Sequence, residues 1–179
     1  MIFFTSDNHF GETRIGRGFN PFFRPFNSVR QQNEFMITRI NACVSRHDEL
    51  YHLGDVAFNI EGLSCLSEIR CKNLTLIKGN YDVDDPHKMP ILERHFKEIA
   101  ESMFLDAGGL QLHLNHYPIN AVKDRFNLVG HIHGLWKVQP NMLNVGVDAW
   151  HFDPVSIEKV AFTKDAIENH YDKNVFPCS

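Results

Sequence analysis

Five short apolar runs in this chain of 179 residues end in the same kinds of polar residue. The runs cover residues 2–6, 50–53, 74–78, 110–114 and 128–129, and each is followed by glycine, aspartate, asparagine or histidine. Apolar runs that are unbroken rather than alternating are typical of strands buried on both faces of a sheet. Because buried polar groups without a partner cost free energy, so many polar strand ends predict a ligand that they share.

Helical patterns lie between the first three runs. Residues 29–44 follow Ser28, which is a suitable N-cap, and residues 61–69 carry a second pattern. The order strand, helix, strand, helix, strand predicts a layered α/β fold. The later runs have little helix between them, which favours one mixed sheet or a sandwich of two sheets. We expect a single domain over residues 1–179 and a long loop over residues 14–27.

Composition narrows the class of function. Eleven histidines exceed what packing requires, and histidine is the commonest metal ligand and the usual proton-transfer group. A net charge of −4 gives no support for a long nucleic-acid footprint or an acidic membrane. No apolar run reaches the roughly 20 residues that span a bilayer, and a basic signal-peptide region is missing. We therefore expect a cytoplasmic protein with no membrane partner and with free thiols at its four unpaired cysteines.

The polar residues at the strand ends are metal-ligand types. If the strand ends lie side by side, they gather Asp7, His9, Asp55, Asn80, His116, His131 and His133. This set is too large for one tetrahedral zinc, and it suits two divalent ions about 3.5–4 Å apart that share a carboxylate. Each motif alone has a simpler interpretation, such as a histidine bonded within the core. Their recurrence after successive apolar runs favours a dinuclear metal centre.

The motifs also resemble those of a known superfamily. They are Asp7-Asn8-His9, Gly54-Asp55, Gly79-Asn80-Tyr81-Asp82, His116 and Gly130-His131-Ile132-His133. In this order they resemble the calcineurin-like metallophosphoesterases, and the stretches TSDNHFG, YHLGD, NHYP and NVGVDAW look like a small bacterial and phage branch. The resemblance runs from residue 4 to about residue 150. It implies a four-layer α/β/β/α sandwich with mixed sheets and a dimetal site at the sheet edge.

The resemblance implies a role for each ligand. Asp55 would bridge two ions, the first held by Asp7, His9 and His133 and the second by Asn80, His116 and His131. It implies a phosphoesterase in which a metal-activated bridging hydroxide attacks phosphorus, with a catalytic set of Asp55, Asn80, Tyr81 and His131. We expect Mn²⁺ to support activity in an assay, although the ligand set also suits Fe, Zn²⁺ or Ni²⁺. Asp82 and Asp148 are the carboxylates expected to orient the histidines.

Tyr81 departs from the family pattern, which has histidine after the motif asparagine. The family's histidine contacts phosphate and is assigned as the proton donor to the leaving group. A phenol is a weaker acid, with a reference pKa of about 10 against about 6.5 for imidazole. We therefore expect a preference for phosphodiesters or nucleotide-derived substrates over alkyl monoesters. The alternatives are that the Tyr81 ring only packs, or that the chain is a catalytically weak scaffold that binds a protein partner.

Four arginines are the candidates for substrate binding. Arg14, Arg17 and Arg24 lie in the long loop, and Arg125 comes shortly before His131. A planar guanidinium binds two phosphate oxygens at once, and the phenylalanines between the loop arginines can stack on bases. The simpler interpretation is a loop that covers the core and carries solvated arginines. We expect a small phosphoester or nucleotide as the partner, and the sequence leaves homo-oligomerisation open.

Overall fold

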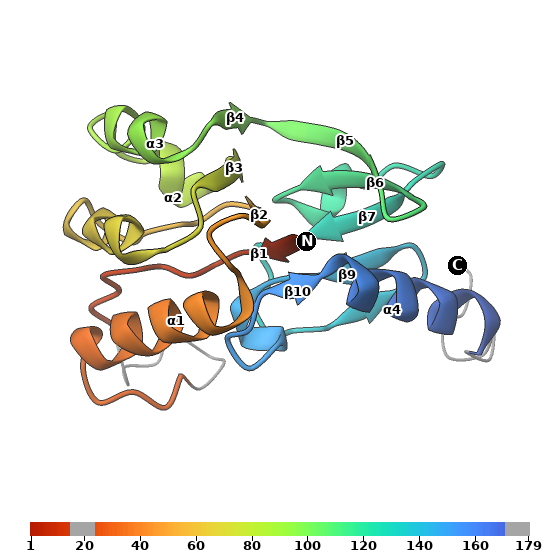
Figure 1. The fold of residues 1–179 in the computed structure, drawn as a ribbon, viewed down its shortest axis with the longest axis horizontal. Coiled ribbons are helices and arrows are strands. Elements are labelled where there is room, and N and C mark those ends of the chain that lie inside the picture. Colours follow the sequence, from red (N-terminus) through yellow and green to blue (C-terminus); the bar gives the residue numbers. More distant parts are fainter. Residues whose placement is uncertain (15–23, 171–179) are drawn as a thin grey trace.

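The computed structural model describes residues 1–14 and 24–170, with two five-stranded sheets at its centre (Figure 1). The first sheet has the strand order β10-β1-β2-β3-β4. Its strands are β1 (Ile2–Thr5), β2 (Glu49–His52), β3 (Asn73–Ile77), β4 (Glu98–Ala100) and β10 (Val155–Ser156). Strands β1 to β4 are parallel and β10 is antiparallel, so the carboxyl ends of β1, β2 and β3 lie at one edge of the sheet.

The second sheet has the strand order β5-β6-β7-β9-β8. Its strands are β5 (Ser102–Ala107), β6 (Leu110–Asn115), β7 (Phe126–Val129), β8 (Val138–Gln139) and β9 (Met142–Asn144). Strands β6, β7 and β9 are parallel, and β5 and β8 pair antiparallel with their neighbours. Gly108 and Gly109 both have positive φ, which is what a two-residue turn between β5 and β6 requires. The apolar runs do not predict β5, because its residues alternate between exposed and half-buried positions.

Helices and short 3₁₀ turns connect the strands. The α-helices are α1 (Val29–Cys43), α2 (Asn80–Val83), α3 (Met89–His95) and α4 (Ile157–Asn169), and the 3₁₀ helices are η1 (Glu61–Glu68), η2 (Pro118–Asn120) and η3 (Val147–Ala149). Ser28 caps α1 as predicted, because its side chain accepts a hydrogen bond from the backbone N–H of Gln31. Among the described residues, none of the helices is both long and apolar enough to cross a membrane.

The second predicted helix forms as the 3₁₀ helix η1 rather than as an α-helix. The hydroxyl of Ser64 donates to the carbonyl of Glu61, and the hydroxyl of Ser67 donates to the carbonyl of Ser64. Side-chain bonds of this kind compete with the regular α-helical pattern. The apolar positions of η1 are nevertheless buried, as the spacing predicts, so the error concerns the type of helix and not its place.

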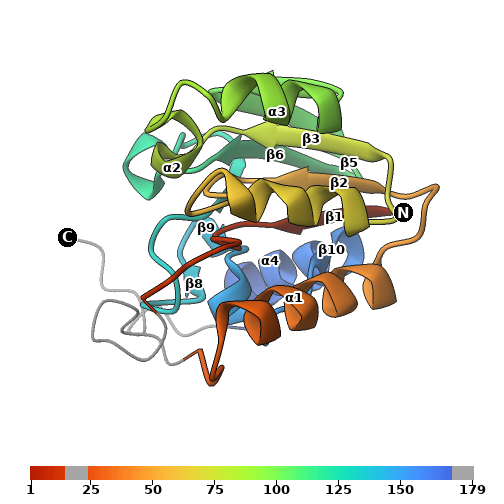
Figure 2. The same ribbon diagram turned by 90° about the vertical axis from the view of Figure 1, so that its left-hand side faces the viewer.

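Two apolar layers hold the fold together. Alternate residues of the first sheet face opposite sides, because side chains along a strand alternate. Phe3 and Leu50 face α1, η1 and α3, which cover one side of the first sheet (Figure 2). Phe4 and Tyr51 face the second sheet, and α4 packs beside β10, β1 and β9. The predicted α/β class with two mixed sheets is confirmed.

The two sheets meet where β1 and β9 end. Ser6 pairs with Gly146 in a parallel bridge, and the N–H of Val147 donates to the Ser6 carbonyl at 3.0 Å. The segments that follow β1, β2 and β3 therefore approach those that follow β6 and β7. Away from this edge, Cys43, Cys65 and Cys71 are free thiols, while Cys178 lies outside the described residues.

Candidate metal centre

The first group of ligand side chains comes from two strands. Asp7 and His9 follow β1, and His133 follows β7. One ligand atom from each of the three residues lies within 4.8 Å of the other two. Asp7 and His9 are buried, while His133 is half-buried and closes the group from the side of the second sheet.

The second group comes from three strands. Asp55 follows β2, His116 follows β6 and His131 follows β7, and their ligand atoms also lie within 4.8 Å of one another. Asn80 begins α2 directly after β3, and its Oδ1 is buried with no hydrogen-bond partner. Asp55 and His116 are buried, whereas His131 is exposed, so the second group opens toward solvent at His131.

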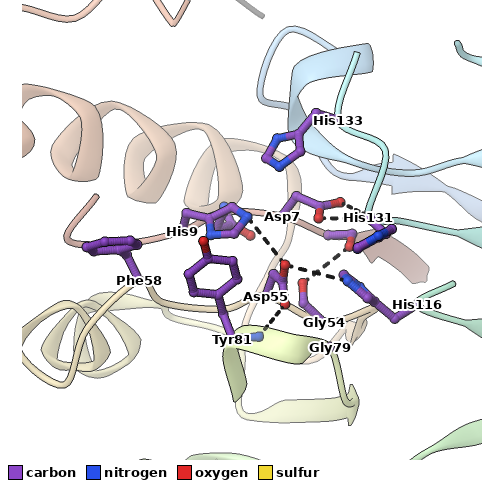
Figure 3. Close-up of polar contacts among 12 residues, drawn as sticks. Asp7, His9, Gly54, Asp55, Phe58, Gly79, Tyr81, His116, His131 and His133 are labelled. Atoms are coloured by element: carbon purple, nitrogen blue, oxygen red, sulfur yellow. Dashed lines mark hydrogen bonds and ion pairs between the residues drawn. The ribbon is translucent and has the colours of Figure 1, made fainter. Parts of the chain in front are cut away.

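Asp55 lies between the two groups. Its Oδ2 is 3.5 Å from Nε2 of His9 and 3.5 Å from Nε2 of His116. Figure 3 shows the two rings on opposite sides of the carboxylate. Both distances exceed those of a good hydrogen bond, so one oxygen faces two imidazoles without bonding well to either. A carboxylate in this position can be shared by two cations.

Left-handed backbone is concentrated at these residues. Seven non-glycine residues in the described chain have positive φ. Five of them are candidate ligands, namely Asp7 (60°), His9 (48°), Asp55 (58°), His131 (72°) and His133 (51°). This conformation is uncommon outside glycine and costs free energy, and strained residues of this kind cluster at functional sites. This backbone conformation turns the ligand side chains back over the ends of their strands.

Buried polar atoms without partners are also concentrated here. Eight buried side-chain N or O atoms in the described residues lack a hydrogen-bond partner, and four of them belong to His9, Asn80 and His116. Natural proteins satisfy nearly all buried polar atoms, so each exception requires an explanation. Imidazole nitrogens, amide oxygens and carboxylate oxygens are ligand atoms that bind divalent ions. The residues present therefore fit a pair of divalent cations.

Hydrogen bonds away from the centre orient two of the histidines. Nδ1 of His116 bonds the Leu53 carbonyl at 2.6 Å, and Nδ1 of His133 bonds Oδ2 of Asp148 at 2.7 Å. A proton held on Nδ1 leaves Nε2 as the ligand atom. Asp148 takes the orienting position expected of it. Asp82 does not, because its carboxylate accepts backbone N–H groups instead.

Asp82 shapes the backbone around the second group. Its two oxygens accept the N–H groups of Asp55, Gly79 and Val56 at 2.8–2.9 Å. Burial raises the pKa of Asp82 to about 6. Gly79 is required beside it, since a side chain there would collide with the Asp55 carboxylate. Together these residues allow two loops from neighbouring strands to approach closely.

The pKa shifts differ from one ligand to the next within each group. Burial lowers the pKa of His9 to about 3, so its imidazole is neutral at neutral pH, as a ligand must be. Burial also disfavours charge on Asp55 and His116, but each favours the charged form of the other. The result is a pKa of about 2 for Asp55 and of about 9 for His116. A cation that takes His116 as a ligand therefore displaces a proton.

Two tyrosines flank the centre. The ring of Tyr81 meets His9 edge-on at 4.8 Å, and its backbone N–H donates to Oδ1 of Asp55 at 2.9 Å. Its hydroxyl accepts a hydrogen bond from Nη2 of Arg14 at 3.2 Å. Tyr117, which sequence reasoning did not single out, meets His131 at 4.9 Å on the other side. The only signal for Tyr117 in the sequence is its position directly after a ligand.

The structure separates the four arginines that were expected to bind substrate. Arg14 lies at the centre, where it bonds both oxygens of Glu12 and stacks over the Phe58 ring at 4.5 Å. Arg24 is buried and bonded to carboxylate and carbonyl oxygens, an arrangement that favours positioning over substrate contact. Arg125 is not brought to the site, because it precedes β7 and the ligands follow β7. Arg17 lies outside the described residues.

Comparison with known proteins gives distant relatives. No family model matches the chain. The uncharacterized protein MJ1445 of Methanocaldococcus jannaschii is 24% identical over 172 residues, which cover 89% of this chain and 88% of that protein. This relative aligns along nearly the whole chain, but its name states no activity and therefore suggests no function.

One solved structure shares the fold, and two others align more weakly. A protein of unknown function from Aquifex aeolicus, AQ665, aligns with a TM-score of 0.66 and 21% identity over 91% of this chain and 98% of its own. The nuclease MPE of Pseudomonas putida aligns at a TM-score of 0.48 with 22% identity, covering 74% of this chain and 61% of its own. The phosphoesterase Yfce of E. coli aligns at 0.46 with 16% identity, covering 81% and 77%. The first likeness shows the fold alone, and the other two are too distant to decide an activity.

Proposed function

We propose that this chain is a dimetal-dependent phosphoesterase of the calcineurin-like superfamily. The observation that carries the proposal is the position of Asp55, one oxygen of which lies 3.5 Å from a histidine of each ligand group. The order of the sequence motifs supports the same superfamily. A structural role explains neither the strained backbone of the ligands nor the buried nitrogens of His9 that have no partner.

Different side chains would hold each of the two ions at such a site. Asp7, His9 and His133 would hold one ion, Asn80, His116 and His131 the other, and Asp55 both. Two divalent ions held there would neutralise charge on the phosphate and lower the pKa of a water. Exposed His131 marks the side from which substrate enters. Tyr81 holds Oδ1 of Asp55 through its N–H, which keeps Oδ2 directed between the groups.

Hydrolysis of an aryl phosphodiester and the matching aryl monoester tests the proposal. We expect turnover with added Mn²⁺, loss of turnover with a chelator, and loss in Asp55→Asn. Asp106→Asn is the matched control, because Asp106 is exposed in β5 and bonds Arg125. If the folded protein binds two ions and hydrolyses neither ester, the enzyme proposal fails and the scaffold function is favoured.

We further propose that phosphodiesters and nucleotide-derived esters are preferred over alkyl monoesters. The support is Tyr81, whose phenol stands where the superfamily has an imidazole and is bonded to Arg14. A phenol donates a proton less readily at neutral pH, so esters with good leaving groups are favoured. We expect Tyr81→His to raise the monoesterase rate relative to the diesterase rate, and Tyr81→Phe to leave that ratio unchanged. A monoester rate in Tyr81→His that is unchanged or lower contradicts this preference.

A further inference from the structure

Arg24 is a buried cation that joins three separate segments. Its side chain is 2% exposed, and its Nε and Nη2 bond the two oxygens of Asp148 at 2.8 and 2.9 Å. Its Nη1 donates to the carbonyl of Asn8 at 2.8 Å, and its Nη2 also donates to the carbonyl of Asp7. One guanidinium thus holds the turn after β1 against the segment of η3.

Both ends of this network reach the first ligand group. Asp148 accepts the hydrogen bond from Nδ1 of His133 while it is held by Arg24. The carbonyls that Arg24 holds belong to Asp7, a ligand, and to the residue before His9. The rings of His9 and His133 lie 5.1 Å apart and within 14° of parallel. Arg24 therefore fixes the ligands that come from β1 and the ligand that comes from β7.

The second ligand group is oriented by different contacts. His116 is held by a backbone carbonyl, and Asp55 is held by the N–H of Tyr81 and by Asp82 through the backbone. None of the hydrogen bonds of Arg24 reaches a residue of this group in the described chain. The two groups share Asp55 and are linked by backbone N–H groups, since His131 donates to the Asp7 carboxylate and His9 donates to the Asp55 carbonyl. The contacts of Arg24 and Asp148 nevertheless fall on the first group.

We propose that Arg24 and Asp148 are positioning residues for the first ion. This inference rests on the proposed function, because it presupposes that the centre holds two cations. The planar fork of arginine makes four bonds here that a lysine cannot reproduce. The opposite charges of Arg24 and Asp148 compensate each other, so the pair orients the ligands without adding net charge beside the ion.

Metal binding to the purified metal-free chain tests this inference without an activity assay. We expect calorimetric titration with Mn²⁺ to show two ions on the wild-type chain. Arg24→Lys and Asp148→Asn should bind one ion about 10- to 100-fold more weakly, the usual cost of losing a residue that orients a ligand. The other ion should bind with its affinity unchanged within about threefold.

The control is a matched arginine–aspartate pair outside the centre. Arg39 bonds both oxygens of Asp153 in the same forked manner but is 39% exposed, and in the described chain neither of these bonds reaches a ligand residue. Arg39→Lys should bind both ions as the wild type does. Two further variants identify which ion binds more weakly: His133→Ala weakens the first ion and His116→Ala the second. The binding curve of Arg24→Lys should resemble that of His133→Ala and not that of His116→Ala. Thermal unfolding of each variant establishes that it is folded.

The outcomes separate this inference from the proposed function. A wild-type chain that binds no divalent ion overturns the proposed function itself. A wild-type chain with two ions and an Arg24→Lys variant with the same two affinities overturns only the role of Arg24. Equal weakening of both ions also overturns it, because it shows a general structural effect. If Arg24→Lys does not fold, the same readings are taken from Asp148→Asn.

Discussion

The two ends of the strands carry polar residues in different states. At the amino ends, charged groups are paired near the surface, as with the terminal ammonium and Asp48, or Arg125 and Asp106. At the carboxyl ends, His9 and His116 are buried, and ring nitrogens of both lack hydrogen-bond partners. A paired surface group needs no further ligand, whereas a buried unpaired one does. The absence of partners, and not the number of polar residues, distinguishes the candidate metal centre.

Exchange of a carboxyl-end histidine gives the largest expected effect. His116→Gln should lower kcat/KM by about two to four orders of magnitude, since a lost ligand removes several kcal/mol of charge stabilisation. His113 is the matched control, because it is also buried, three residues earlier, but bonds Oδ1 of Asn127 at 2.9 Å. His113→Gln should change kcat/KM by less than about tenfold. Equal losses in the two variants would show that burial alone explains the effect.

Divalent cations should stabilise the folded chain by binding to the ligand groups at the carboxyl ends of the strands. Saturation to about 100 times the Kd adds about 2.7 kcal/mol for each site, which corresponds to roughly 5–10 °C in Tm for a chain of this size. Calorimetry of the chelator-treated chain with and without Mn²⁺ measures this shift. Sodium chloride of equal ionic strength is the control. A Tm that rises equally with both salts would mean that the centre does not bind the ion specifically.

His52 provides a pH test at the same end of the strands. Burial lowers its pKa to about 3, against about 6.5 in the unfolded chain, so the unfolded chain binds the proton first as the pH falls. The stability that neutral His52 contributes is complete above pH 6.5 and is lost progressively as the pH falls toward 3. Between pH 7 and pH 5 the loss from this one group is about 2 kcal/mol.

Urea unfolding of the metal-free chain at pH 7 and pH 5 measures this loss. His52→Gln should reduce the pH dependence by about that amount, because glutamine does not titrate. His47→Gln, at an exposed position before β2, is the control for the replacement of a histidine by glutamine. If His52→Gln retains the full dependence, the acid sensitivity belongs to other groups at this end.

The smallest effect is expected at the amino end. Arg125 bonds the exposed carboxylate of Asp106, and a surface pair of this kind contributes about 0–1 kcal/mol. Arg125→Ala should therefore leave kcat/KM within about twofold of the wild type and lower the free energy of unfolding by less than about 1 kcal/mol. A larger loss of activity would mean that substrate extends to the far end of β7.

Local sequence patterns predicted much of the first sheet and the ligand types. The unbroken runs that became β1, β2 and β3 are buried on both faces, and Ser28 is recognisable as a cap from its neighbours alone. Strand β5 is missed, because it lies at the edge of its sheet and alternates between exposed and half-buried positions instead of being buried on both faces. The type of η1 is also missed, since it depends on side-chain bonds of Ser64 and Ser67 that spacing does not reveal.

The sequence by itself determined that polar ligand residues follow buried strands, because strand burial and strand ends are local properties of the chain. Only the tertiary structure decided which of these residues meet, since that depends on strand order and direction. It placed Asp55 between two histidines that lie 46 and 61 residues away along the chain. It also buried Arg24 against Asp148 and left Arg125 at the far end of its strand. An arginine's role depends on the carboxylate it meets, and that partner is distant in sequence.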